Sequence, residues 1–84
     1  MAVAETQKRE ALLGLRMNEE ARRLGLTPPQ LAKASGVVLS IVQRIGHGQG
    51  KRVSAWSVVA LADTLGVTTD YLLGRTAVRT LPTS

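Results

Sequence analysis

The sequence predicts an all-α fold of five short helices, and two kinds of observation support this. Apolar residues recur at the three- and four-residue spacing of helix faces, whereas no segment alternates apolar and polar residues long enough for a strand. Glycines follow the apolar segments and threonine or serine precedes several of them, as at helix ends and starts. With 84 residues, the chain can bury a modest core in one domain.

The first helix is expected from about Glu5 to Leu24, because this stretch is rich in helix-forming residues and has no proline. Thr6 is its expected N-cap, and Gly25 is expected to end it in the left-handed conformation. The apolar stripe of this helix consists of Leu13, Met17, Ala21 and Leu24.

A second and a third helix are expected in quick succession. Thr27 and Gln30 form a capping box around two prolines, which suit the first helical positions, and Ser35-Gly36 ends this helix. The third helix is expected from about Leu39 to Ile45, with Val42 and Ile45 facing inward. Residues 46–50 contain three glycines and are expected to form a loop.

Two further helices complete the predicted fold. Ser54 caps a fourth helix that Gly66 closes, and Thr68 caps a fifth, Thr69 to Leu73, that Gly74 ends. We therefore expect residues 1–12 to extend the first helix, residues 13–74 to form the folded domain and residues 75–84 to form a loosely ordered, flexible tail. The fourth helix carries Ala55, Val58, Leu61, Ala62 and Leu65.

The composition argues against an enzyme, a metalloprotein and a membrane protein. The chain has no cysteine and one histidine, no paired carboxylates on one face, and no phosphate-binding glycine motif before a helix. We therefore expect no catalytic residues, no metal and no cofactor. No run approaches the ~18 apolar residues of a membrane span, and the first residues lack the features of a signal peptide, so a cytoplasmic location is expected.

The distribution of charge indicates a polyanionic partner. The formal net charge is +5, and all six acidic residues lie before residue 21 or after residue 62. Between these positions lie six basic residues and no acid, whereas ordinary soluble surfaces mix both signs. A solvated basic face without a ligand is the alternative interpretation.

Two short helices joined by a tight, glycine-containing turn form the helix-turn-helix layout, and this layout suits the major groove of DNA. Beyond this layout, the chain resembles the phage repressor and Cro-type family of regulators (XRE-like). The residues that carry the resemblance are Leu31-Ala32, Gly36-Val37, Val42, Ile45, Gly48, Leu61-Ala62, Leu65-Gly66-Val67 and Asp70-Tyr71-Leu72-Leu73-Gly74. The resemblance implies a lambda-repressor-like domain of five helices that binds double-stranded operator DNA as a homodimer, with Thr27–Gly48 as the DNA-reading unit.

Carried over position by position, the resemblance implies three groups of contact residues. Residues placed at the bases are Leu39, Ser40, Gln43 and Arg44. Residues placed at phosphates are Thr27, Gln30, His47, Gln49, Lys51 and Arg52. Residues placed at the dimer interface are Trp56, Thr69 and Leu72, although Trp56 is expected first of all to cover the glycine-rich loop.

Three of the base-contact positions have alternatives. Gln43 can bind adenine or a phosphate, but it could also be a solvated side chain. Arg44 can donate two hydrogen bonds to guanine, but it could also be a solvated cation at a helix end. Leu39 stands where the family usually has a polar residue, so it either contacts a thymine methyl group or belongs to a surface that faces protein.

The sequence departs from the family at three places. Val38 stands where many relatives have a serine or threonine as N-cap of the third helix. Ala21 and Gly46 replace an arginine–glutamate pair, and Pro28 replaces a glutamine that binds phosphate.

The favoured function is therefore a sequence-specific DNA-binding regulator, most simply a bacterial or phage-encoded repressor. The alternative is an antitoxin-like or other protein-interaction module with weak or no DNA binding. Its protein partner would be a toxin or the C-terminal domain of a longer regulator.

Overall fold

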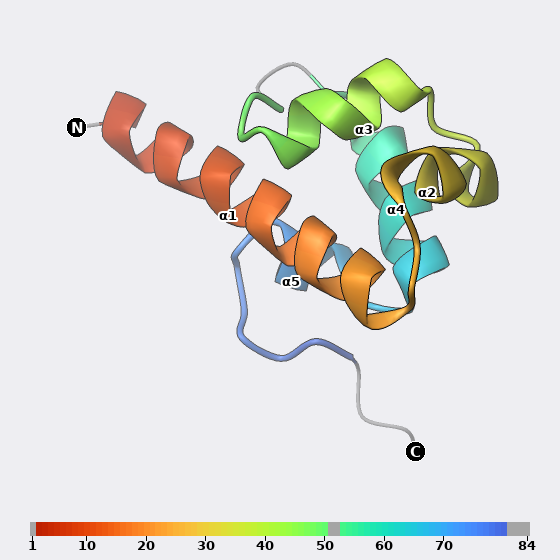
Figure 1. Ribbon diagram of the computed structural model, residues 1–84. Helices are drawn as coiled ribbons and strands as arrows, with labels where there is room; N and C mark the ends of the chain where they lie inside the picture. Colours follow the sequence, from red (N-terminus) through yellow and green to blue (C-terminus); the bar gives the residue numbers. More distant parts are fainter. Residues whose placement is uncertain (1, 51–52, 81–84) are drawn as a thin grey trace.

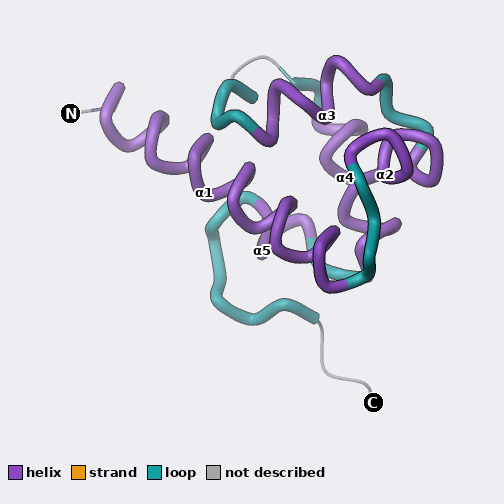
Figure 2. Tube along the Cα trace, in the orientation of Figure 1, coloured by secondary structure: helices purple, strands orange, loops and turns teal. Residues whose placement is uncertain are grey.

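The computed structural model describes residues 2–50 and 53–80, and this part of the chain contains five α-helices and no strand. The helices are α1 (Ala2–Arg23), α2 (Pro28–Ser35), α3 (Leu39–Gly46), α4 (Ala55–Leu65) and α5 (Thr69–Leu72). Figure 2 shows the five helices joined by loops. The expectation of an all-α fold is confirmed.

The long helix α1 packs against three of the other four helices. It contacts α3, α4 and α5, while α2 contacts α3 and α4. Figure 1 shows α2 and α3 together at one end of the molecule, α5 behind α1, and the first turns of α1 extending beyond the other helices. The chain after α5 returns past α1 toward the C-terminus (Figure 1).

Local capping chemistry accounts for where most of the helices begin. The Thr27 hydroxyl accepts a hydrogen bond from the Gln30 amide (3.4 Å), and the Gln30 side chain accepts one from the Thr27 amide (2.9 Å). Ser54 accepts from the Ser57 amide, and Thr68 accepts from the Tyr71 amide. These three predicted caps are confirmed. Gly36 and Gly66 are the C-caps of α2 and α4, as predicted, and Gly25 has the left-handed conformation predicted for it after α1 (φ 73°).

Three predicted helix boundaries need correction. The first helix begins at Ala2, so Thr6 lies inside it and is not its N-cap. Gly46 is the last residue of α3 and not the first of the loop. Leu73 is the C-cap of α5 and not its last residue, because the Leu73 and Gly74 amides already close the final turn.

The core is aliphatic and draws on all five helices. Its largest fully buried side chains are Met17, Leu31, Val42, Ile45, Leu61, Leu65 and Leu72. Leu13 and Ala21 are also buried, which confirms most of the expected stripe on α1. The prediction that Leu24 belongs to the buried stripe was wrong. Leu24 is 47% exposed, because it follows the end of the helix.

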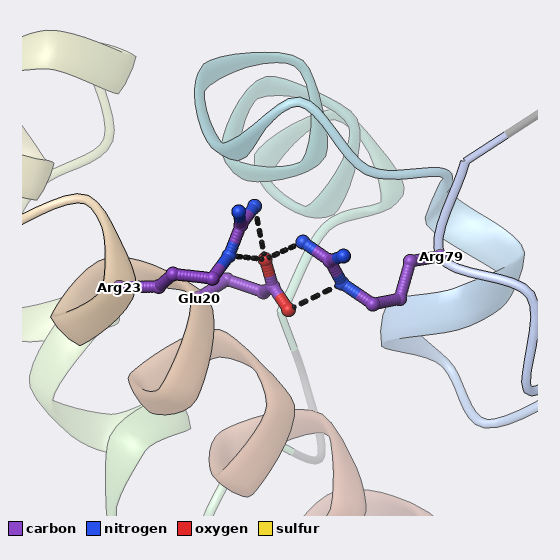
Figure 3. Close-up of polar contacts among 3 residues, drawn as sticks. All are labelled: Glu20, Arg23 and Arg79. Carbon is purple, nitrogen blue, oxygen red and sulfur yellow. Dashed lines mark hydrogen bonds and ion pairs between the residues drawn. The ribbon is translucent and has the colours of Figure 1, made fainter.

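Hydrogen bonds join the chain after α5 to α1 and to the start of α5, within the stretch for which a loosely ordered tail is expected. Arg79 donates to both carboxylate oxygens of Glu20, at 2.6 and 2.8 Å, and Arg23 donates to one of them (Figure 3). The Thr68 amide donates to the Arg79 carbonyl at 2.9 Å. The hydrogen bonds from Arg79 hold the pKa of the Glu20 carboxyl below its ordinary value, although burial acts in the opposite direction.

A second arginine joins the tail to the core. The Arg16 guanidinium donates to the carbonyls of Tyr71 and Thr76, and its central carbon lies 4.2 Å from the centre of the Tyr71 ring. Arg16 thereby binds one carbonyl of α5 and one of the chain after it, and it adds a cation–π contact.

Within the described residues, no helix is long and apolar enough to cross a membrane.

Candidate nucleic-acid interface

Helix α3 lies against α1 at two specific positions. Gly14, inside α1, is buried, and a Cβ atom there would collide with the backbone carbonyl of Ile45. One turn further along α1, the Asn18 side-chain amide donates to the Gly46 carbonyl at 3.2 Å. The small residue permits the close approach, and the amide binds a carbonyl that the end of α3 leaves free. Together they fix the end of α3 on α1.

The turn between α2 and α3 has three residues, Gly36 to Val38. Gly36 has a φ of 76°, and the Ser35 hydroxyl accepts a hydrogen bond from the Val37 amide (3.2 Å). Val37 is buried, whereas Val38 is 67% exposed. Val38 stands at the N-cap position of α3. It makes no side-chain capping bond, because a valine side chain has no hydrogen-bond acceptor. The start of α3 therefore points toward solvent with amides that no side chain caps.

Helix α3 has one buried and one exposed face. Val42 and Ile45 are buried, at 1% and 0% exposure, as predicted. Ser40, Gln43 and Arg44 are exposed, whereas Leu39 is half-buried against the core. Of the four predicted base-contact residues, three thus have exposed side chains on the outer face. The side chain of the fourth, Leu39, packs partly against the core.

Arg44 differs from the arginines around the tail. Arg16, Arg23 and Arg79 each donate to carbonyl or carboxylate oxygens of the protein. The side chains of Arg44 and of Lys33 on α2 are exposed, and neither forms a hydrogen bond or ion pair with a residue in the described ranges. The donors of Arg44 are therefore available to an outside acceptor.

A shallow hollow brings the starts and ends of different helices together. It has a volume of about 250 Å³, and its lining residues are Asn18, Pro28, Val42, Gln43, Gly46 and His47. An adjoining hollow of about 220 Å³ shares Asn18, Pro28 and Val42 and reaches Arg22 on α1. The N-terminus of α2 and the C-terminal half of α3 thus border one surface, on which the predicted Gln43 and His47 meet.

The predicted phosphate-contact residues lie around this surface to different extents. Thr27 and Gln30 are exposed at the start of α2, where their capping box leaves the Thr27 hydroxyl hydrogen and the Gln30 amide hydrogens free. His47 and Gln49 are exposed just after α3, and their amides donate to carbonyls of its last turn. Lys51 and Arg52 lie outside the described residues.

The predicted dimer residues require two corrections. Leu72 is fully buried at 0% exposure, because it faces the core shared with α1 and α4, so its side chain is not available to a second copy. Trp56 is 81% exposed, so it does not cover the glycine-rich loop. Thr69 is partly exposed at the start of α5 and remains accessible.

Sequence reasoning missed the residues that position α3, namely Gly14 and Asn18. A glycine inside an otherwise good helix is the one signal that could have indicated a close contact, since it costs about 1 kcal/mol relative to alanine. Within the described ranges, no cluster of three or more histidine, cysteine, aspartate or glutamate side chains could hold a metal ion.

Comparisons of the chain with family models, with curated proteins and with solved structures found no match.

Proposed function

We propose that this protein is a sequence-specific DNA-binding regulator with a lambda-repressor-like fold, in which α2 and α3 form the helix-turn-helix. The observation that carries the proposal is the outer face of α3, where the donors of Ser40, Gln43 and Arg44 are exposed. Arg44 forms no hydrogen bond with a described residue, although three other arginines of the chain do. A helix face that presents an arginine and other exposed donors suits the acceptors of guanine and of phosphate.

In this proposal α3 lies in the major groove, which is about 12 Å wide and accepts an α-helix. Arg44 donates to the O6 and N7 atoms of guanine, and Gln43 and Ser40 bind neighbouring base edges. The exposed part of Leu39 contacts a thymine methyl group. Because Val38 supplies no side-chain cap, the first amides of α3 remain free for water or phosphate.

The phosphate contacts in this proposal border the hollow between α2 and α3. The N-terminus of α2 presents backbone amides, and Thr27 and Gln30 keep free donor hydrogens beside them. His47 and Gln49 supply donors at the end of α3. Lys51 and Arg52 bind phosphates in this proposal because the resemblance places them there and their positive charge suits phosphate.

A second candidate function has a specific observation in its favour. Val38 at the start of α3 is 67% exposed and Trp56 on α4 is 81% exposed. Apolar residues that form an exposed patch are typical of surfaces that bind protein, so an antitoxin-like interaction module that uses one of these residues is the alternative. In that case α3 or α4 binds a protein partner, and affinity for DNA is weak or absent.

Fluorescence anisotropy with labelled random duplexes at several salt concentrations separates the two functions. The DNA proposal predicts binding at about 50 mM salt, and the logarithm of the affinity should fall by about 0.9 per phosphate contact for each logarithmic unit of salt. Absence of binding at about 50 mM salt would contradict it and favour the interaction module.

Substitutions then test which residues read the bases. Arg44→Ala should remove about 1–3 kcal/mol of discrimination at one base pair of a selected site, whereas Lys51→Ala should weaken binding to all duplexes alike. Arg75→Ala is the matched control, because it removes the same charge from an exposed position beyond α5. If Arg44→Ala and Lys51→Ala both reduce affinity uniformly, α3 does not read bases.

A further inference from the structure

A recess lies where the ends of α1 and α3 meet the start of α2. It consists of the two shallow hollows of about 220 and 250 Å³, which share Asn18, Pro28 and Val42. A phosphate group is only a few times larger than the ~30 Å³ that a water molecule occupies in the liquid, so either hollow has room for one. None of the described residues that line the recess is acidic. The recess is therefore a candidate site for an anion.

Arg22 borders one end of the recess. Its side chain is exposed and forms no hydrogen bond or ion pair with a residue in the described ranges. The neighbouring carboxylate of Glu20 is already bound by Arg23 and Arg79. No ion pair of the described residues joins Arg22 to Glu19, three residues earlier on α1. The charge and the planar donors of Arg22 are therefore available to the oxygens of a phosphate.

Exposed donors border the other end of the recess, where Gln43 and His47 lie. The contacts of Asn18 bring the two ends close together. Asn18 precedes Arg22 by four residues, so the two side chains are neighbours on the surface of α1. The Asn18 amide also donates to the carbonyl of Gly46, the residue before His47. Donors from α1 and from the end of α3 therefore meet across one recess.

We propose that this recess binds one phosphate group, with the Arg22 guanidinium on one side and the His47 imidazole on the other. Arg22 lies outside the Thr27–Gly48 unit and belongs to none of the contact groups that the resemblance implies. A phosphate of the DNA backbone and a free phosphate ion present the same oxygens, so the site accepts both. Where DNA supplies the group, Arg22 fixes the end of α1 on the backbone, and this consequence alone rests on the proposed function.

Titration of the protein alone with inorganic phosphate, followed by NMR, tests the site without DNA. The side-chain N–H signals of Asn18 and Arg22 and the backbone amide signal of His47 should shift and reach saturation at millimolar concentrations of phosphate. Sodium chloride at the same ionic strength should shift them little, because it screens charges without occupying the recess. Shifts no larger than those caused by chloride would overturn the proposal, whether or not the protein binds DNA.

Substitutions test the two sides of the site. Arg22→Gln should weaken phosphate binding about tenfold or more, because it removes the charge but keeps a polar side chain at an exposed position. Arg23→Gln is the matched control: it removes the same charge from the neighbouring exposed residue, which is bound to Glu20, and it should leave phosphate binding unchanged. Equal losses in these two variants would reveal a general effect of charge and would overturn the proposal. His47→Ala should weaken binding about fivefold, and an unchanged affinity would contradict the place of His47 in the site.

The salt dependence of duplex binding identifies the source of the phosphate. If the DNA backbone supplies it, Arg22→Gln should make the slope of log affinity against log salt less steep by about 0.9, which corresponds to one phosphate contact, and Arg23→Gln should not. An unchanged slope in Arg22→Gln, together with saturable binding of inorganic phosphate, assigns the site to the free ion. Absence of duplex binding at about 50 mM salt contradicts the proposed function but leaves the phosphate site supported by its own titration.

Discussion

The tail that crosses α1 and the outer face of α3 both carry arginines, but they use them differently. At the tail, Arg79 and Arg23 share one carboxylate, Glu20, whose side chain is only 6% exposed. On α3, Arg44 is exposed and forms no hydrogen bond or ion pair within the described ranges. The net charge of +5 therefore does not by itself mark a binding surface. In the proposed function the exposed donors of Arg44 mark that surface, whereas the donors of Arg79 and Arg23 are already bound to the protein.

The two regions also differ in how they are held. The tail contact joins residues 59 positions apart through charged side chains. The α3 contact depends instead on the absence of a side chain at Gly14 and on a single amide, that of Asn18. Substitutions at the tail contact should therefore change the stability of the fold alone, whereas substitutions at the α3 contact should also change the position of the candidate DNA surface.

The largest effect is expected at Gly14. Gly14→Ala should lower the free energy of unfolding by about 2–3 kcal/mol, although alanine is the better helix former, because its Cβ atom meets the rigid carbonyl of Ile45. Urea denaturation measures the loss. Gly46→Ala is the matched control, since its Cβ atom would meet the movable Asn18 side chain at 3.2 Å, and it should cost less. Equal losses would mean that Gly14 is not the point of closest approach.

The next effect is expected at the tail. Glu20→Gln removes the carboxylate that Arg79 and Arg23 share, so the melting temperature should fall by about 5–10 °C while the affinity for duplex DNA stays unchanged. Glu19→Gln changes the same charge at the exposed neighbouring position and should have little effect. A loss of DNA affinity in Glu20→Gln without loss of folding would contradict the claim that the tail contact takes no part in DNA binding.

Acid should weaken the same contact. The folded pKa of Glu20 lies below its unfolded value, so its contribution is complete above the unfolded pKa of about 4.3 and disappears as the pH falls through the folded pKa. Denaturation of the native protein and of Glu20→Gln at pH 7 and at about pH 3 should therefore show a smaller difference in acid. A difference that grows in acid would contradict the assigned sign.

A smaller gain is expected at the start of α3. Val38→Ser should raise the melting temperature by about 5 °C, because a hydroxyl at this N-cap position can accept a hydrogen bond from a free amide of the first turn. Val38→Ala removes the exposed apolar surface without adding an acceptor, so it should give no such gain. An equal gain in both variants would attribute the effect to lost apolar exposure and not to capping.

Features set by neighbouring residues could be predicted from the sequence. The capping box of Thr27 and Gln30 and the end of α2 at Gly36 depend on contacts within a few residues, and both were predicted. The fifth helix is too short for its apolar pattern to show which leucine faces inward. Leu72 was therefore placed at an interface although it is buried.

Features that join distant parts of the chain could not be predicted in this way. Nothing near Glu20 in the sequence indicates that Arg79 would bind it, or that Asn18 would bind the end of α3. For the candidate site, periodicity correctly predicted the buried Val42 and Ile45, and hence the exposed Gln43 and Arg44. The half-buried position of Leu39 depends on the core beneath it and could not be predicted from its own segment.

The most direct measurement of the central claim is the change in backbone amide NMR signals as a duplex is added. The account predicts that the largest changes fall at the start of α2, along α3 and in the residues just after it, and that Arg44→Ala reduces them. Signals of the tail and of α1 around Glu20 should change little. Largest changes at the tail, with α3 unaffected, would contradict the assignment of the DNA-binding surface.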